Sequence, residues 1–186
     1  MRRFMVLLFL LGSFVSSCGS SISVKVDWST KALGSGVQSP AMPANLPAVK
    51  VVKVVDGDTI DVQLGGKTER LRLIGINTPE TVDPRSQVEC FGKEASDRAK
   101  ATLTNQTVYL EGDPSQQERD RYDRLLRYVW LSDGRLVNLD MIAQGYAYEY
   151  TYDVPYKYQA EFRQAQQQAQ SGKVGLWSPQ TCSGQK

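Results

Sequence analysis

The chain has 186 residues, of which 41% are hydrophobic and 23% are charged, and its formal net charge is +2. This composition fits one globular domain with short additional segments and excludes a disordered or fibrous protein. The chain contains no histidine, which excludes an imidazole general base, a Ser-His or Cys-His pair and a His-ligated metal. Acid–base groups are therefore expected to be carboxylates, and any metal to be a hard, oxygen-ligated cation.

The first 17 residues have the pattern of an export signal. Arg2 and Arg3 precede an apolar run from Phe4 to Leu11, which is too short to span a bilayer. Small residues directly before Cys18 resemble the cleavage site of a bacterial lipoprotein; an ordinary secretory signal is the alternative. We therefore expect an exported protein that is anchored to the bacterial cell envelope through lipidated Cys18, or secreted if Cys18 carries no lipid.

A flexible tether is expected to follow the signal. Residues 18–47 are rich in Ser, Gly, Ala and Pro, a composition typical of linkers. Removing residues 1–17 takes away two arginines and no acidic residue, so the formal net charge falls from +2 to 0. The mature chain is therefore not a strongly basic nucleic-acid-binding protein, and any attraction to phosphate must be local.

The sequence becomes β-rich at Ala48. A valine-rich run over 49–55 and an alternating run over 59–64 predict two strands, and Gly65-Gly66 predicts the hairpin turn after the second. A third strand is expected over 71–76, where Leu71, Leu73, Ile74 and Ile76 supply the apolar residues. Residues 49–76 therefore predict a three-stranded meander.

The rest of the chain predicts three helices and two strands. We expect a helix over 93–103, strands over 107–110 and 125–131, and a short helix capped by Asn138 and ending near Gly145. A last helix is expected to start at 153–155 and end near Gly172, with Tyr158, Phe162, Ala165 and Ala169 on its apolar face. This order predicts an α+β fold, mainly a five-stranded barrel with helices outside, over residues 48–178, followed by a C-terminal tail over 179–186.

Three short segments carry the chemistry. They are Asp56–Thr59, Arg72–Glu80 and Asp120–Arg124. Each has an ordinary explanation when taken alone: an Asp-Gly turn, a helix start at Thr78-Pro79, and a solvated run of charges. Together they offer carboxylates for a metal and for a base, and guanidinium groups for a phosphate.

In order and spacing the segments resemble the staphylococcal nuclease family. The resemblance runs from about Val49 to Ser178 and includes these further segments: Gly92–Ser96, Val137-Asn138, Gln144-Gly145 and Gly175–Ser178. It implies a five-stranded OB-type barrel with three helices, acting as a monomer. It also implies calcium-dependent cleavage of DNA and RNA phosphodiester bonds with little sequence preference. Magnesium or another divalent cation is the alternative metal.

The resemblance assigns metal binding and catalysis to matching positions. Asp58, Asn77 and Thr78 match the metal-binding positions, and Asp56 matches an acid that supports the metal through water. Glu80 matches the carboxylate that activates or orients the attacking water. The two phosphate-binding arginines match Arg72 and Arg124.

The remaining assignments concern the substrate. Arg121 and Tyr122 match positions that hold another phosphate of the nucleotide. Tyr150 and Tyr152 are candidates for a platform on which a base stacks, and core packing is the alternative reading of this tyrosine-rich segment.

Two residues depart from the family pattern. Asn77 stands where the family usually has a second calcium carboxylate, so we expect weaker calcium binding than in relatives with Asp. Asp123 stands where the family usually has glycine, and its charge is expected either to pair with Arg124 or to repel the substrate.

Cys90 and Cys182 remain after Cys18 is assigned to the anchor. Because an exported chain meets an oxidising compartment, we expect them to form a disulfide, with two unpaired thiols as the alternative.

A second function class stays open. Barrels of this kind that have lost catalytic residues bind nucleic acid or protein, with weak or no catalysis. All four central residues of the family site are present here, namely Asp58, Arg72, Glu80 and Arg124. Their presence favours an enzyme over a binding module or a purely structural envelope protein.

Overall fold

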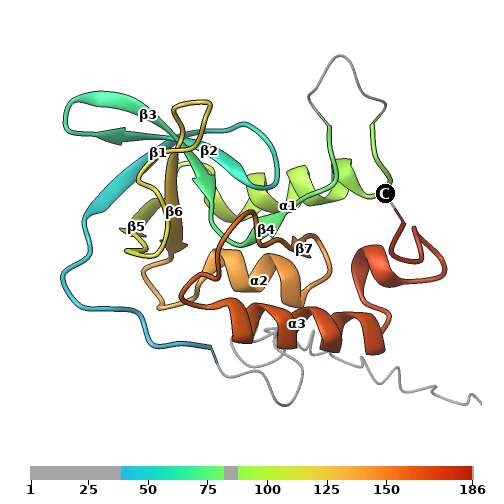
Figure 1. The fold of residues 1–186 in the computed structure, drawn as a ribbon. Coiled ribbons are helices and arrows are strands. Elements are labelled where there is room, and N and C mark those ends of the chain that lie inside the picture. The colour runs from blue at the N-terminus through green and yellow to red at the C-terminus, as the bar shows by residue number, and fades with distance from the viewer. Residues whose placement is uncertain (1–38, 82–87, 186) are drawn as a thin grey trace, which may run out of the picture.

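Five strands close into a barrel in the order β1-β2-β3-β6-β5 (Figure 1). The computed structural model describes residues 39–81 and 88–185; the expected signal, Cys18 and most of the tether lie outside this part. The barrel strands are β1 (Ala48–Val54), β2 (Thr59–Leu64), β3 (Lys67–Leu73), β5 (Thr107–Glu111) and β6 (Leu125–Trp130). The helices are α1 (Gly92–Leu103), α2 (Val137–Ala143) and α3 (Gln159–Ser171). The predicted α+β fold with a five-stranded barrel and three helices is confirmed.

Four antiparallel strand pairs and one parallel pair make up the barrel. β2 pairs antiparallel with β1 and with β3, and the β2–β3 turn has positive φ at Gly65 (56°) and Gly66 (80°). β3 pairs in parallel with β6, and β5 closes the barrel between β6 and β1. The parallel contact lays β6 beside the strand that carries Arg72.

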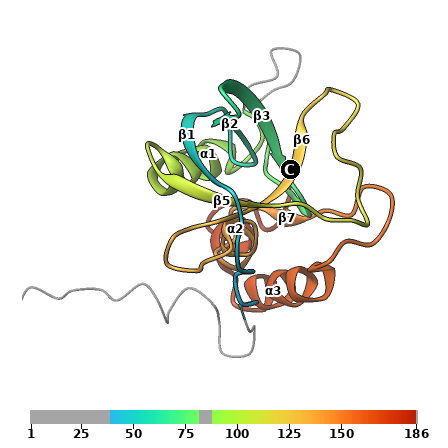
Figure 2. The ribbon, with the colours of Figure 1, turned by 90° about the vertical axis from the view of Figure 1, so that its left-hand side faces the viewer.

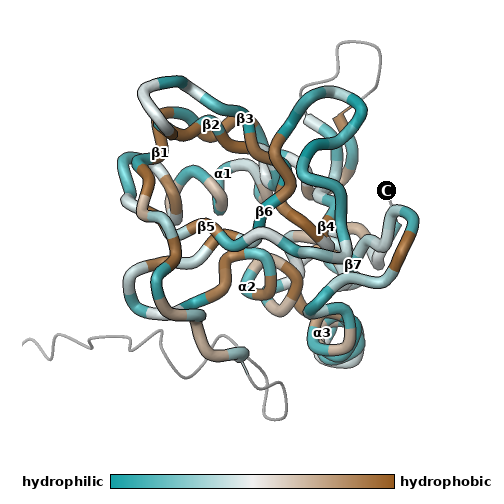
Figure 3. The backbone as a smooth tube through the Cα atoms, turned by 60° about the vertical axis from the view of Figure 1, so that its left-hand side comes forward, coloured by the Kyte–Doolittle hydropathy of each residue, from teal (hydrophilic) through white to brown (hydrophobic). Residues whose placement is uncertain are grey.

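Apolar side chains fill the space between the barrel and the helices. Trp130, Tyr128 and Phe162 are the largest fully buried side chains, and Tyr128 packs edge-on against Phe162 with ring centroids 6.2 Å apart. Ala165 and Ala169 are buried with Phe162 on one face of α3, as the spacing predicts. In Figure 3 the hydrophobic residues are concentrated in the barrel strands and α2, whereas the residues of the loop between β5 and β6 are mostly hydrophilic. Figure 2 shows α2 and α3 together at one end of the barrel.

The predicted third strand is wrong at both ends. β3 starts at Lys67 and stops at Leu73, and the chain turns at Gly75, which has φ 78°. A Cβ at Gly75 would lie 2.7 Å from the Tyr156 ring, so only glycine fits this turn. The chain then forms the short strand β4 (Ile76–Asn77), which pairs with β7 (Tyr148–Glu149) in a separate sheet. Because of this break, Asn77 does not continue β3 but belongs to β4.

Two helix boundaries also differ from the prediction. α3 begins at Gln159 rather than at 153–155, because side chains bind the preceding segment: the Lys157 N–H donates to Asp113, and the Tyr156 hydroxyl donates to Glu149. Asn138 is not a cap but lies inside α2 and is fully buried. Its Oδ1 accepts the Val129 N–H, and its Nδ2 donates to the Ile74 carbonyl oxygen.

A disulfide joins Cys90 to Cys182, with the two Cα atoms 5.9 Å apart. Cys182 is buried, and the Gly184 N–H donates to the Leu176 carbonyl oxygen of the short 3-10 helix η1 (Gly175–Trp177). The C-terminal residues up to 185 therefore pack onto the domain beside the segment that precedes α1. Closing a loop of this length stabilises a fold by about 4–5 kcal/mol in the chain-entropy model. Within the described ranges, no helix has the length and hydropathy needed to cross a membrane.

Candidate active site

The Asp58 carboxylate is the buried centre of the site, with the residue only 6% exposed. Its Oδ2 accepts hydrogen bonds from the Thr78 N–H (2.9 Å) and the Thr78 hydroxyl (3.0 Å). Its Oδ1 accepts from the Thr59 hydroxyl (3.0 Å) and lies 3.2 Å from the Arg72 Nε. One carboxylate thus joins the start of β2, the end of β3 and the segment that leads to Glu80.

Arg72 is held in one orientation from several sides. Its Nη1 donates to the carbonyl oxygens of Leu73 and Ile76, both at 2.8 Å. Its Nη2 donates to the Asn77 Oδ1 at 3.2 Å. The side chain is 13% exposed. A guanidinium fixed in this way loses little further conformational freedom when it binds an anion.

Asp56 and Asp58 place two carboxylates side by side in the turn between β1 and β2. The Asp58 N–H donates to the Asp56 Oδ1 at 2.9 Å. Burial and the neighbouring charge of Asp58 raise the pKa of Asp56 to about 6. The negative charge of this turn is therefore incompletely compensated by the protein itself.

The donor set around Asp58 fits a hard divalent cation. It contains the Asp56 and Asp58 carboxylates, the Asn77 amide oxygen and backbone carbonyl oxygens, and such oxygens are the ligands of calcium and magnesium. Among residues 39–81 and 88–185, no three acidic, histidine or cysteine side chains gather as a metal cluster.

Reciprocal hydrogen bonds fix the backbone of Glu80. The Glu80 N–H donates to the Glu89 Oε2, and the Glu89 N–H donates to the Glu80 carbonyl oxygen, both at 2.9 Å. The Glu80 Oε1 also accepts the Thr81 N–H at 2.8 Å. Since Glu89 directly precedes Cys90, the disulfide and this clamp restrain the same segment. Glu89 was not predicted, because nothing in the sequence marks a partner nine residues beyond Glu80.

Asp120 orders the loop that carries Arg124. Its Oδ2 accepts from the Arg124 Nε at 2.6 Å, and its Oδ1 accepts the N–H groups of Tyr122 and Arg124 at 2.9 and 3.0 Å. Burial opposes ionisation of Asp120, but the hydrogen bonds from Arg124 and Tyr122 outweigh it and lower its pKa. No role was predicted for Asp120. Its signal in the sequence is an Asp at the start of a turn, where the side chain accepts the N–H two residues on.

The predicted substrate residues lie on the surface. Tyr122 is 65% exposed, and the guanidinium carbons of Arg121 and Arg124 lie 4.8 and 5.3 Å from its ring centroid. Tyr150 and Tyr152 are also exposed, with ring centroids 6.3 Å apart. All three rings therefore offer a face to solvent or to a ligand.

Asp123 does not pair with Arg124. It has φ 63°, in the left-handed region that glycine adopts most readily, and its carboxylate lies 3.6 Å from the Arg119 Nε. Its side chain is 87% exposed.

Comparison with known proteins places these residues in a family. The family model described as staphylococcal nuclease homologue matches residues 70–179. The thermonuclease of Staphylococcus hyicus is 50% identical over 135 residues, which cover 73% of this chain and 78% of the relative. The thermonuclease of Staphylococcus intermedius is 43% identical over 127 residues (68% and 74%). The chain belongs to the staphylococcal nuclease family.

A third relative of this chain is less similar. Endonuclease YncB of Bacillus subtilis is 38% identical over 131 residues, which cover 70% of this chain and 61% of the relative. The matched family region begins at residue 70 and so excludes Asp56 and Asp58. Asp58 is tied to that region by its contacts with Arg72 and Thr78.

The raised pKa of Asp56 predicts a stability effect in the cation-free protein. Above about pH 6, Asp56 is ionised in the folded protein, and its charge lowers the free energy of unfolding. Between about pH 6 and pH 4 the folded protein binds a proton at Asp56 that the unfolded chain does not, so this loss of stability disappears as the pH falls. In chelator at pH 8, Asp56→Asn should therefore stabilise the protein by up to about 3 kcal/mol. Urea unfolding at pH 8 and pH 4.5 measures this; an equal effect at both pH values would contradict it.

Proposed function

We propose that the protein is a calcium-dependent nuclease that hydrolyses phosphodiester bonds of DNA and RNA with little sequence specificity. The observation that carries the proposal is the contact of the buried Asp58 carboxylate with the immobilised Arg72 guanidinium. The relatives named as thermonucleases and an endonuclease support the same reaction class.

Arg72 and Arg124 are proposed to bind one phosphate together. Arg72 pairs with Leu126 across the parallel β3–β6 contact, and Arg124 lies two residues before Leu126. From strand spacing, the two Cα atoms are roughly 8 Å apart on one side of the barrel, within reach of two long side chains that converge. A guanidinium matches two phosphate oxygens in one plane, which lysine does not.

Glu80 is the proposed general base. It removes a proton from the attacking water, whose oxygen bonds to phosphorus as the ester P–O bond breaks and the leaving oxygen takes up a proton. Arg72 and Arg124 stabilise the negative charge that builds on the non-bridging oxygens. Asp58, Asn77 and the Thr78 carbonyl would hold calcium, with Asp56 supporting it through water, and the bound ion would supply positive charge that polarises the phosphate. The sequence holds no histidine that would replace Glu80 as the base.

Contacts beyond the reacting phosphate are expected to be insensitive to sequence. Arg121 and Tyr122 lie beside Arg124 and are proposed to hold a neighbouring phosphate. Tyr150 and Tyr152 are proposed to stack on a base, and every base has a face that stacks.

We also propose that the protein is exported and anchored through a lipid on Cys18. The oxidising compartment that a Cys90–Cys182 disulfide requires supports export. Metabolic labelling with a radioactive fatty acid should mark the wild-type protein in a bacterial host, and Cys18→Ser should remain unlabelled. Labelling that survives this substitution would rule out Cys18 as the anchor.

Cleavage assays separate the enzyme from a binding module. The purified protein should cut single-stranded DNA, duplex DNA and RNA in calcium and lose this activity in chelator. Glu80→Gln should lower kcat about 10²–10⁴-fold, and Arg124→Lys about 10²–10³-fold, with thermal unfolding little changed. Arg163→Lys, an exposed arginine on α3, is the matched control. Binding without cleavage in every metal would establish the binding module instead.

Asn77 predicts weak calcium binding. Asn77→Asp adds a carboxylate beside Arg72 and Asp58, so the calcium concentration for half-maximal activity should fall roughly tenfold. Calcium titrations of the initial cleavage rate measure this. An unchanged midpoint would show that the amide does not limit calcium affinity.

A further inference from the structure

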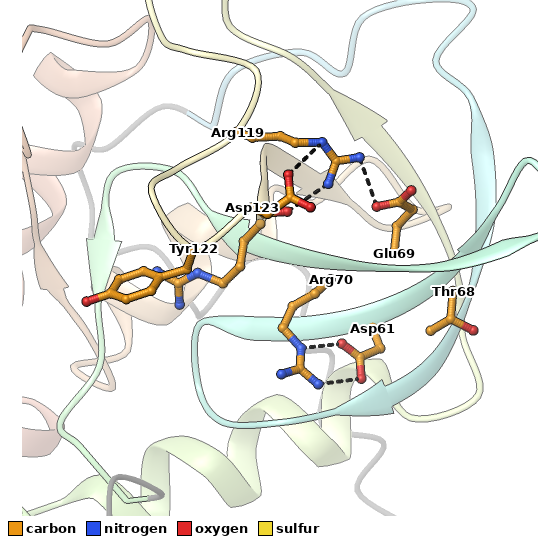
Figure 4. Close-up of a pocket in the computed structure, with 8 residues that line it drawn as sticks. Asp61, Thr68, Glu69, Arg70, Arg119, Tyr122 and Asp123 are labelled. Carbon is orange, nitrogen blue, oxygen red and sulfur yellow. Dashed lines mark hydrogen bonds and ion pairs between the residues drawn. The ribbon is translucent and has the colours of Figure 1, made fainter.

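A cleft of about 380 Å³ lies beside Arg124, outside the group of residues around Asp58 (Figure 4). Arg70 and Asp61 line one side, Arg119 and Glu69 line the other, and Tyr122 and Arg124 also border it. Of these residues only Tyr122 and Arg124 have a role in the reaction proposed above. Three of its six charged side chains are arginines, including the proposed phosphate ligand Arg124.

Arg70 lies beside the two proposed phosphate-binding arginines, because it precedes Leu71 as Arg124 precedes Leu125 in the parallel β3–β6 register. It lies two residues before Arg72 on β3, so both side chains project from the same face of the strand, roughly 6.6 Å apart at Cα. This separation is close to the distance between consecutive phosphates of an extended single strand. Arg124 and Arg70 both line the cleft.

Each of these three arginines is oriented by its own carboxylate. Arg72 contacts Asp58 and Arg124 contacts Asp120, as described above. The Arg70 Nε and Nη2 donate to the two Asp61 oxygens at 2.7 and 3.1 Å. Asp61 is buried, whereas the Arg70 side chain is 51% exposed.

The ion pair therefore fixes the orientation of the Arg70 guanidinium and leaves the side chain half exposed to solvent. The bidentate contact uses one edge of the guanidinium, so Nη1 is the nitrogen that Asp61 does not engage. Across the cleft, Arg119 is held by Glu69 at 2.9 Å and by the Asp123 carbonyl oxygen at 2.7 Å. A phosphate in the cleft would meet guanidinium groups from both walls.

We propose that this cleft is a phosphate subsite for single-stranded nucleic acid, with Arg70 as its main ligand and Arg119 as the second. The strand leaves the reacting phosphate at Arg72 and Arg124 and follows the outer face of β3 toward the β2–β3 hairpin. This proposal rests on the nuclease function above, because it assumes that the reacting phosphate lies at Arg72.

The test compares long and short substrates. Arg70→Gln should lower kcat/KM about three- to tenfold for a twelve-nucleotide single strand and leave a dinucleotide with one scissile bond unchanged. Binding of the twelve-nucleotide strand in chelator, followed by fluorescence anisotropy, should lose about 0.7 from the slope of log K against log salt. Asp61→Asn should tighten that binding, because it removes a negative charge and releases the guanidinium.

Arg163→Gln is the matched control, since Arg163 is an exposed arginine on α3 that does not line the cleft and lies 3.7 Å from Glu149. If Arg70 had only a structural role, both Arg70→Gln and Asp61→Asn would lower the stability of the protein. Arg70→Gln would then change kcat/KM equally for the long and the short substrate, and this result would overturn the subsite. An effect confined to duplex DNA would also overturn it. If the wild-type protein binds the long strand through Arg70 but cleaves nothing, the nuclease proposal fails and the subsite stands.

Discussion

The buried Asp58 carboxylate is the constraint on which the site depends. It accepts hydrogen bonds from Thr59 and Thr78 and lies against the Arg72 guanidinium. Losing one partner of a buried charged pair costs about 3–5 kcal/mol, because the other charge stays buried and unpaired. The same contact that stabilises the junction of β2, β3 and the Thr78 segment therefore also fixes the orientation of Arg72. The Asp58 carboxylate thus both stabilises the fold and positions the Arg72 guanidinium.

Pairing each arginine with an acid is the means by which a chain of low net charge is proposed to recognise phosphate. The expected mature chain has no net charge, so long-range attraction to nucleic acid is weak. Asp58, Asp61 and Asp120 each hold a guanidinium in a defined direction. Such preorganised donors act at short range and need little rearrangement when the phosphate arrives.

The sequence predicted most of the fold and the family, but not the contacts that support the candidate site. The alternation over 59–64 and the spacing on α3 are local patterns, so they located β2 and the buried face of α3. The break at Gly75 depends on the Tyr156 ring, which is distant in sequence. The hydrogen bond of the buried Asn138 with Ile74 also joins residues that are distant in sequence. The Asn138 hydrogen bond with Val129 and the Glu80 hydrogen bond with Glu89 each join residues nine apart. Propensity carries no information on contacts of this kind.

Calcium binding by Asp58 is the most direct test of the account, because Asp58 is proposed to hold both the cation and Arg72. Isothermal titration calorimetry of calcium should detect binding to the wild-type protein. Asp58→Asn should lower that affinity about 100-fold or more, since it removes the buried carboxylate that is proposed to bind the cation directly. Circular dichroism verifies that the variant is folded. Equal calcium affinity in a folded Asp58→Asn variant would contradict the assignment of the metal site.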